Sequence, residues 1–231
     1  MVKISKRKKS NDSLLEKDKR YSLKEAVSLI KNASKTKFDE SVDISMKLNV
    51  KPKEVTQPIR GTVALPHGTG KKTRVCCLCK GEDESKAKAA GAEYVGADEL
   101  ITKITGGWTD FDVVVTTPEM MKDIARLGKI LGPKGLMPNP KSGTVTKDID
   151  AAIKEIKRGK IEYKMDKQSG IHASIARLSF DETAIIENAR EFLHAVITTS
   201  PALAKPQTVG SIAISKTMGP GVKLEISEFK R

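Results

Sequence analysis

The 231-residue chain is long enough for one large or two ordinary domains, and it carries 42 Lys and Arg against 29 Asp and Glu, a net charge of +13. No apolar run approaches the roughly 20 residues of a membrane span, and the basic N-terminus lacks the apolar segment of a secretory signal. Such an excess of positive charge attracts polyanions by counterion release, so we expect a cytoplasmic protein with a nucleic-acid partner.

The positive charge is concentrated in the outer parts of the chain. Residues 1–67 carry 16 basic and 8 acidic side chains, residues 68–158 carry 16 and 13, and residues 159–231 carry 10 and 8. Residues 1–20 are predicted to form a basic arm that stays disordered until it meets a phosphate backbone. Because aromatic residues make up only 4% of the chain, shape and backbone contacts are expected to outweigh base stacking.

The two outer segments show the patterns of an α+β protein. Ser22 and Glu25 form a capping box before an apolar helical stripe, and residues 42–50 alternate strictly between apolar and polar, as in a strand with one buried face. Further strands are predicted at 59–65, 161–165, 171–178, 209–215 and 222–226, with a long helix at 181–199. Neither outer segment can bury its apolar face alone, so together they are expected to form one sheet with helices on one side.

The middle block has a different pattern. Residues 74–79 and 112–116 are short continuous apolar runs, which are typical of strands buried on both faces of a parallel sheet. Helices are predicted at 83–90, at 118–131 with Thr117 as N-cap and Pro118 in the first turn, and at 148–158. This order favours a small doubly wound α/β unit.

The predicted fold combines these two patterns. Residues 1–66 and 160–231 form a discontinuous α+β RNA-binding domain, with residues 1–20 as its flexible arm. Residues 67–159 form an inserted, Rossmann-like, three-layer α/β domain. The short crossings, at residues 66–70 and near Gly159, are predicted to act as a hinge.

Several motifs suggest chemistry that their context does not support. Residues 67–73 (HGTGKKT) fail the P-loop pattern, since Leu65 stands where the first glycine should be and Lys72 follows Lys71. Cys76, Cys77 and Cys79 fall in a predicted buried strand, so we expect reduced, structural thiols. His194 is predicted to be a half-buried packing residue of the long helix. We expect no catalytic residue, no metal and no cofactor.

Two loops are candidates for contact with RNA. Residues 215–221 (SKTMGPG) join the two closing strands, and Lys216 offers charge, Thr217 a hydroxyl and Met218 a polarizable apolar surface, a make-up suited to a ribose-phosphate edge. Residues 131–146 (LGPKGLMPNPKSGTVT) combine prolines, glycines, Lys134 and Lys141 without an acid. We interpret this loop as a rigid basic surface rather than a catalytic loop.

The segments KFDES (37–41), RGTVALPHGTG (60–70), LGPKGLMPNPKSGTV (131–145), Asp166-Lys167 with Ile171-His172, and SKTMGP (215–220) occur in the order found in one family. In these segments the chain resembles the "L one" family of large-subunit ribosomal proteins, over about residues 21–226. The resemblance implies two domains with a hinge, no enzymatic activity, and a free protein that is monomeric. It implies that the partners are the stalk region of large-subunit ribosomal RNA, exit-site transfer RNA, and the leader of the protein's own operon messenger RNA.

Family contacts carry over to individual positions of this chain. The resemblance assigns RNA binding to Lys37, Phe38, Ser41, Lys164, Lys167, Ser211, Thr217, Met218 and Gly219. The hairpin departs from the family pattern, with Met165 where Asn is usual and the turn glycine at Gly170, and residues 51–57 also depart from it. We further hypothesise that Lys134 and Lys141 face stalk RNA or passing transfer RNA.

Three other interpretations are compatible with the sequence. The chain could be a general nucleic-acid-binding protein, which would show no preference for one RNA fold. It could be an enzyme that uses the α/β block, or an assembly protein without affinity for free RNA.

Overall fold

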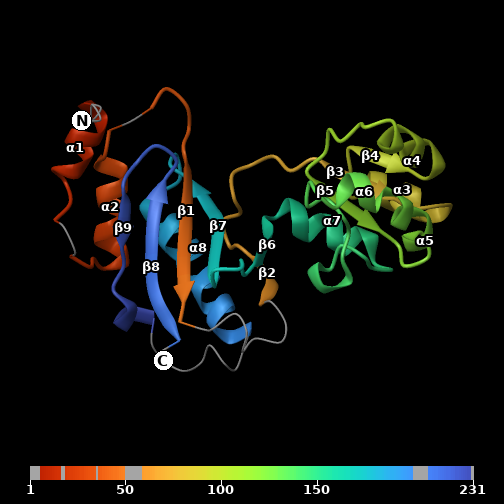
Figure 1. Cartoon of the computed structure of the whole chain (residues 1–231). Coiled ribbons are helices and arrows are strands. Elements are labelled where there is room, and N and C mark those ends of the chain that lie inside the picture. The colour runs from red at the N-terminus through yellow and green to blue at the C-terminus, as the bar shows by residue number, and fades with distance from the viewer. Residues whose placement is uncertain (1–5, 17–18, 35, 50–58, 200–207, 230–231) are drawn as a thin grey trace. The chain divides into compact units, whose positions relative to one another are not determined.

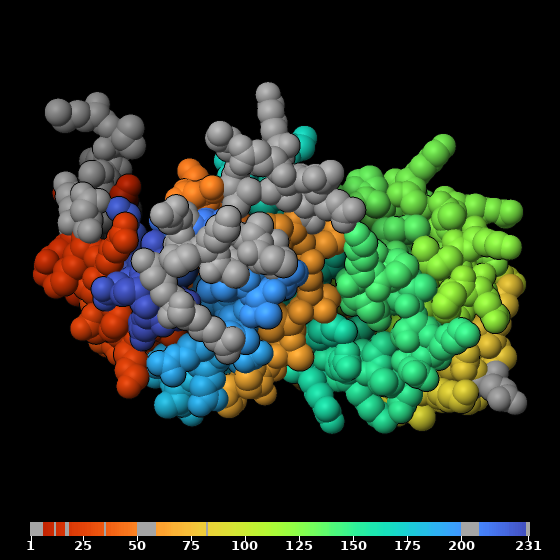
Figure 2. All heavy atoms as spheres, turned by 90° about the horizontal axis from the view of Figure 1, so that it is seen from below, coloured from red at the N-terminus to blue at the C-terminus, as the bar shows by residue number. Residues whose placement is uncertain are grey.

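The structure is a computed structural model that describes residues 6–16, 19–34, 36–49, 59–199 and 208–229. The chain forms two compact units, one made of residues 1–70 and 161–231 and the other of residues 71–160. In the space-filling view, red, orange and blue atoms from the two ends of the chain share the first unit, whereas the second is yellow and green (Figure 2). The predicted mixture of helices and strands is confirmed.

The first unit is built on an antiparallel sheet in the order β7-β1-β8-β9. Helices α2 and α8 lie behind this sheet in Figure 1 and carry much of its apolar core. The bounds are α1 (Lys6–Asp12), α2 (Leu23–Asn32), β1 (Ser41–Leu48), β2 (Arg60–Ala64), β6 (Lys160–Lys164), β7 (Gly170–Arg177), α8 (Glu182–Thr199), β8 (Val209–Lys216), β9 (Gly221–Lys223) and a closing 3-10 turn η3 (Ile226–Phe229).

Local sequence explains the start of α2 and the orientation of β1. The Ser22 hydroxyl accepts a hydrogen bond from the Glu25 N–H, and the Glu25 carboxylate accepts one from the Ser22 N–H, so the predicted capping box is confirmed. Alternate residues of β1 are buried, beginning with Val42 and Ile44, as the period of two predicted.

Four predictions for the first unit are corrected. Strands β2 and β6 pair with each other in a separate two-stranded sheet instead of joining the large one. The closing strand ends at Lys223, before η3. His194 is exposed, because the buried stripe of α8 runs through Ala189, Phe192, Leu193 and Val196. Residues 6–12, predicted to be disordered, form α1.

The second unit is a parallel sheet in the order β4-β3-β5. Residues of β3 alternate between two cores, with Val75 and Cys77 in one and Cys76 and Leu78 in the other, which explains the continuous apolar run. Its bounds are β3 (Val75–Leu78), α3 (Glu82–Ala89), β4 (Tyr94–Gly96), α4 (Asp98–Thr105), β5 (Val113–Thr116), α5 (Met121–Ile124), η1 (Ala125–Leu127), α6 (Gly128–Leu131), η2 (Pro140–Ser142) and α7 (Ile149–Lys157).

The helix predicted at 118–131 is wrong in its continuity. It begins three residues later, at Met121, and breaks into α5, η1 and α6. Met120, Ile124, Leu127 and Leu131 are all buried at spacings of three and four, which is why the pattern resembled one helix. Strand β4 and helix α4 were not predicted.

The three thiols are buried and free, as predicted. Burial raises the pKa of Cys76 to about 12, and it also raises the pKa of Cys77 well above the ordinary value. Because thiolates are the reactive form, these cysteines are inert packing residues in the folded protein.

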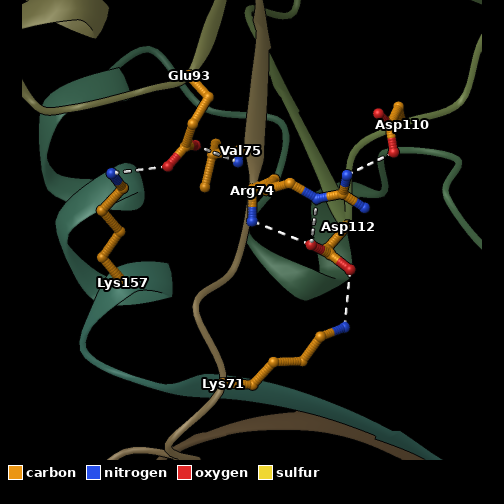
Figure 3. A network of polar contacts seen from close by, with 7 residues as sticks. All are labelled: Lys71, Arg74, Val75, Glu93, Asp110, Asp112 and Lys157. Carbon is orange, nitrogen blue, oxygen red and sulfur yellow. Dashed lines mark hydrogen bonds and ion pairs between the residues drawn. The ribbon is translucent and has the colours of Figure 1, made fainter.

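A polar network ties the start of β3 to the strands beside it (Figure 3). Asp112 accepts hydrogen bonds from Lys71 Nζ at 2.7 Å, from the Arg74 N–H at 3.0 Å and from Arg74 Nε at 3.3 Å. Partial burial raises the pKa of Asp112, but these hydrogen bonds lower it more, and the result is about 2.

Replacing Asp112 with asparagine is expected to destabilise the second unit by about 1–2 kcal/mol at pH 7, a figure reduced for solvent screening. Since the folded pKa of about 2 lies below the ordinary 3.8, the contribution is complete above about pH 5 and is lost as the pH falls toward 2. Urea unfolding followed by the fluorescence of Trp108, the single tryptophan, measures this at pH 7 and pH 3. The variant should be clearly weaker at pH 7, and at pH 3, which lies between the folded and the ordinary pKa, about half of that difference should remain.

Asp150→Asn is the matched control, because the ion pair of Asp150 among the described residues is an exposed one, with Lys154 on the surface of α7. Exposed pairs four residues apart on a helix contribute about 0.3–0.5 kcal/mol. Equal effects of the two variants at pH 7 would contradict a special role for the Asp112 network.

Candidate nucleic-acid interface

The large sheet has one face turned away from α2 and α8. Register places Asp43 opposite Ser174 and Ser215, Ser45 opposite His172 and Ala213, and Lys47 opposite Ser211. We call this surface the open face; its residues are Ser41, Asp43, Ser45, Lys47, His172, Ser174, Ser211, Ala213, Ser215 and Lys223. They are small or polar, and each is partly or fully exposed.

At one end of the open face, the turn between β8 and β9 is tied to the start of β1. We call residues 217–220 the recognition turn. The Thr217 N–H donates to the Ser41 carbonyl at 3.1 Å, and the Ser41 N–H donates to the Thr217 hydroxyl at 3.1 Å. The Met218 N–H donates to Glu40 Oε2 at 2.9 Å. These bonds bring Ser41, Thr217 and Met218 together from segments far apart in the chain.

A buried ion pair lies beneath the recognition turn. Glu40 and Lys216 are both fully buried in their side chains, and Lys216 Nζ lies 3.5 Å from Glu40 Oε1. Lys216 Nζ also donates to the carbonyls of Ala33 and Ser34 at 3.1 and 3.0 Å. The expectation that Lys216 offers charge to RNA is therefore wrong, because its buried ammonium binds Glu40 and the two backbone carbonyls.

Gly219 is required by this packing. A Cβ at position 219 would lie 2.3 Å from Cγ of Lys216, closer than real side chains approach one another. The glycine therefore lets the turn close over the aliphatic stem of the buried lysine.

Two large apolar side chains are exposed at the same end. Phe38 is 55% exposed and Met218 is 51% exposed, and they are two of three such side chains among the described residues. Lys37 is exposed beside Phe38, and the Thr36 hydroxyl donates to the Phe38 carbonyl at 2.8 Å. Exposed aromatic and thioether surfaces of this kind are suited to stacking on unpaired bases.

The remaining predicted contacts of the first unit lie toward the other end. Ser211 lies opposite Lys47, six residues along β1 from Ser41, or about 20 Å at the rise of a strand. Lys167 is exposed in the turn between β6 and β7, where the Ser169 carbonyl accepts from the Leu48 N–H at 2.8 Å. Lys164 ends β6 and is exposed. The structure thus separates the predicted residues into two clusters.

Hydrogen bonds to Asp166 run across the β6–β7 turn. The Asp166 carboxylate accepts from the Gly170 N–H at 2.6 Å and from the Gln168 N–H at 2.8 Å. These backbone donors hold the pKa of Asp166 below its ordinary value. Ser169 takes a φ of 63°, which is uncommon for a residue other than glycine. The turn leaves Lys167 exposed despite its departure from the family pattern.

Lys134 and Lys141 are both exposed on the second unit. The loop that carries them is ordered by short-range bonds: the Asn139 side chain accepts from the Lys141 N–H at 3.0 Å, and the Thr144 hydroxyl accepts from the Asn139 N–H at 2.8 Å. Lys134 donates to the Thr109 hydroxyl. The loop is therefore a fixed surface that carries two cations.

The described residues contain no group of three or more His, Cys, Asp or Glu side chains placed to hold a metal ion. Within the same part of the chain, no helix is long and apolar enough to cross a membrane.

Sequence reasoning missed Glu40, Asn11 and Ser34, and it gave Lys216 the wrong role. They matter because they support the recognition turn and the loop before β1. One signal in the sequence could have indicated that Lys216 is buried. In the alternating pattern of β8, position 216 lies on the same face as Ile212 and Ile214. The partners, however, come from distant segments, and no local pattern marks them.

Comparison with known proteins identifies the family of the chain. Residues 29–220 match the Ribosomal protein L1p/L10e family. The chain is 49% identical over 225 residues to a protein of Parabacteroides distasonis and 50% identical to one of Porphyromonas gingivalis, with 97% of each chain covered. It is 51% identical to a protein of Flavobacterium psychrophilum, covering 97% of this chain and 98% of the relative. All three are named large ribosomal subunit protein uL1. The resemblance inferred from motifs is confirmed: the chain belongs to the Ribosomal protein L1p/L10e family.

Proposed function

We propose that the chain is a constituent of the large ribosomal subunit that binds the ribosomal RNA of the mobile lateral stalk through the recognition turn and the open face. One observation carries the proposal. Ser41, Thr217 and Met218 come from two distant segments, yet they meet at one end of a sheet above a buried ion pair. Phe38, three residues before Ser41, is exposed. Relatives named as large-subunit proteins support the assignment of this chain to the large ribosomal subunit and a ribosome-associated, cytoplasmic location.

The surface has the groups that structured RNA requires. The Thr217 hydroxyl and the turn backbone can meet ribose hydroxyls, and Gly219 allows close approach. Phe38 and Met218 offer stacking surfaces, while Lys37, Lys164 and Lys167 offer charge to phosphates. The two clusters, about 20 Å apart along β1, fit a folded RNA better than a short single strand. None of this requires catalysis, and membership in a family of ribosomal proteins confirms the expected non-enzymatic role.

The test is binding of the full chain to the stalk fragment of large-subunit ribosomal RNA and to an unrelated duplex of equal length, across a salt series. A preference for the stalk fragment of at least about a thousandfold, the margin of specific recognition, is expected to persist as salt rises. If both RNAs bind alike and weaken together with salt, the chain is a general polyanion binder and the proposal fails.

The same surface is proposed to bind the leader of the protein's own operon messenger RNA and thereby repress translation. Stalk RNA and leader RNA should then compete for one site. Displacement of labelled stalk fragment by leader RNA, at a ratio set by the two affinities, is expected; simultaneous binding of both RNAs would contradict a shared site. We propose that the free protein engages either RNA as a monomer.

The second unit is proposed to help release exit-site transfer RNA through Lys134 and Lys141. Replacing both with glutamate should weaken transfer-RNA contact on the ribosome, since each reversal opposes a phosphate. Binding of the isolated stalk fragment should remain unchanged. Crosslinking of transfer RNA to reconstituted ribosomes measures the first quantity, and the salt-series assay measures the second.

Lys103→Glu with Lys122→Glu is the matched control, because both lysines are exposed in the same unit and the change in net charge is identical. If the control weakens transfer-RNA contact as much as the Lys134 and Lys141 variant, the loop has no special role. Equal loss of stalk-RNA binding and transfer-RNA contact in the test variant would also contradict a specific contact of Lys134 and Lys141 with transfer RNA.

A further inference from the structure

Helix α1 is docked on the first unit. Asn11 is only 4% exposed, and its Oδ1 accepts from the Ser34 hydroxyl at 2.9 Å and from the Ser34 N–H at 3.3 Å. Downstream, Leu15 packs against the apolar core, and the Glu16 N–H donates to the Tyr21 hydroxyl at 3.0 Å. A polar side chain this deeply buried fixes the helix at one place.

The docking point connects to the recognition turn through a short chain of bonds. Ser34 receives α1 through its N–H and hydroxyl, while its carbonyl accepts from Lys216 Nζ. Lys216 pairs with Glu40, whose other oxygen holds the Met218 N–H. Figure 1 shows α1 at the end of the sheet where β8 leads into β9. The helix therefore lies beside the proposed RNA contact.

The residues of α1 are strongly basic. Helix α1 contains Lys6, Arg7, Lys8 and Lys9 against one acid, Asp12, at its last position. Arg7 lies four residues before Asn11 and therefore on the same side of the helix, and it is partly buried. Lys9 is exposed. At 1.5 Å per residue, both lie within about 6 Å, along the helix axis, of the Asn11 docking point.

We propose that α1 is a fixed second RNA contact, whose Arg7 and Lys9 bind phosphates of the strand that flanks the segment held by the recognition turn. This rests on the proposed function and extends it. Docked cations lose less conformational freedom on binding than a disordered basic tail does, so α1 adds affinity without adding base specificity.

The first experiment compares Arg7→Gln/Lys9→Gln with Lys103→Gln/Lys122→Gln, which removes the same charge from exposed positions of the second unit. Binding of the stalk fragment is measured across a salt series with the full chain. The α1 variant should bind about tenfold more weakly at low salt, and its slope of log K against log salt should be shallower by about 1.5, the value for two lost phosphate contacts. If it matches the control, α1 makes no contact and the proposal is overturned.

The second experiment tests whether docking matters. Asn11→Ala keeps every cation but removes the acceptor for Ser34. It should therefore lose most of the stalk-RNA affinity that Arg7→Gln/Lys9→Gln loses. Adding Arg7→Gln/Lys9→Gln to Asn11→Ala should then cost little more. Wild-type binding by Asn11→Ala, or full additivity of the two changes, would show that α1 acts as a loose polycation and would overturn the fixed contact. Circular dichroism melts confirm that each variant is folded.

The two proposals fail differently. If wild type shows no preference for the stalk fragment over the duplex, the proposed function is wrong. If the preference holds and the α1 variant equals its control, only the α1 contact is wrong.

Discussion

Replacing Thr217 with valine is expected to weaken binding to the stalk RNA by about tenfold to a hundredfold, with little change in stability. The hydroxyl accepts from the Ser41 N–H, and valine removes that acceptor while keeping the branched shape. In the free valine variant, the exposed Ser41 N–H can donate a hydrogen bond to water instead. In the complex it is covered by RNA, so the lost hydrogen bond and an unsatisfied donor together cost about 1–3 kcal/mol.

Thr217→Ser is the matched control, because it retains the hydroxyl and should keep most of the preference for stalk RNA. The salt slope should be the same for wild type and both variants, since no phosphate contact changes. If the valine variant binds stalk RNA as tightly as wild type, the recognition turn is not part of the interface. Equal loss in the serine variant would point to packing of the turn rather than to the hydroxyl.

Replacing Lys216 with methionine is expected to destabilise the first unit by about 3–5 kcal/mol, the usual cost of leaving one member of a buried ion pair without its partner. The ammonium balances Glu40 and bonds the Ala33 and Ser34 carbonyls. Adding Glu40→Gln should recover most of the loss, because a neutral amide can still accept from the Met218 N–H. Stability is measured by urea unfolding.

The two units provide an internal control for this measurement. Trp108 lies in the second unit against Tyr94 and Phe111, so its fluorescence reports on that unit alone. The Lys216 variant should shift the circular dichroism transition of the first unit and leave the Trp108 transition in place. A shift in both, or no recovery in the double variant, would contradict a local buried pair as the cause.

Much of the secondary structure could be predicted because it depends on local patterns. The capping box at Ser22 starts α2, alternation defines β1, and the continuous apolar run marks β3 as buried on two faces. Helix 118–131 was predicted as continuous because burial at a helical spacing does not distinguish one helix from three short ones. The separate β2–β6 sheet was missed because the sequence pattern of a strand does not indicate which other strand it pairs with.

The sequence by itself determined the basic charge, the content of helices and strands, the buried thiols and, through its motifs, the family. Only the tertiary structure decided which polar residues act together. Glu40 and Lys216 read as ordinary surface charges because lysine and glutamate are seldom buried, yet folding pairs them beneath the recognition turn. Asn11 likewise sits in a basic stretch that composition assigns to a disordered arm, but its side-chain oxygen accepts from Ser34 and thereby fixes α1 in place. Such pairs form between segments that meet only in the folded chain, and no local pattern encodes them.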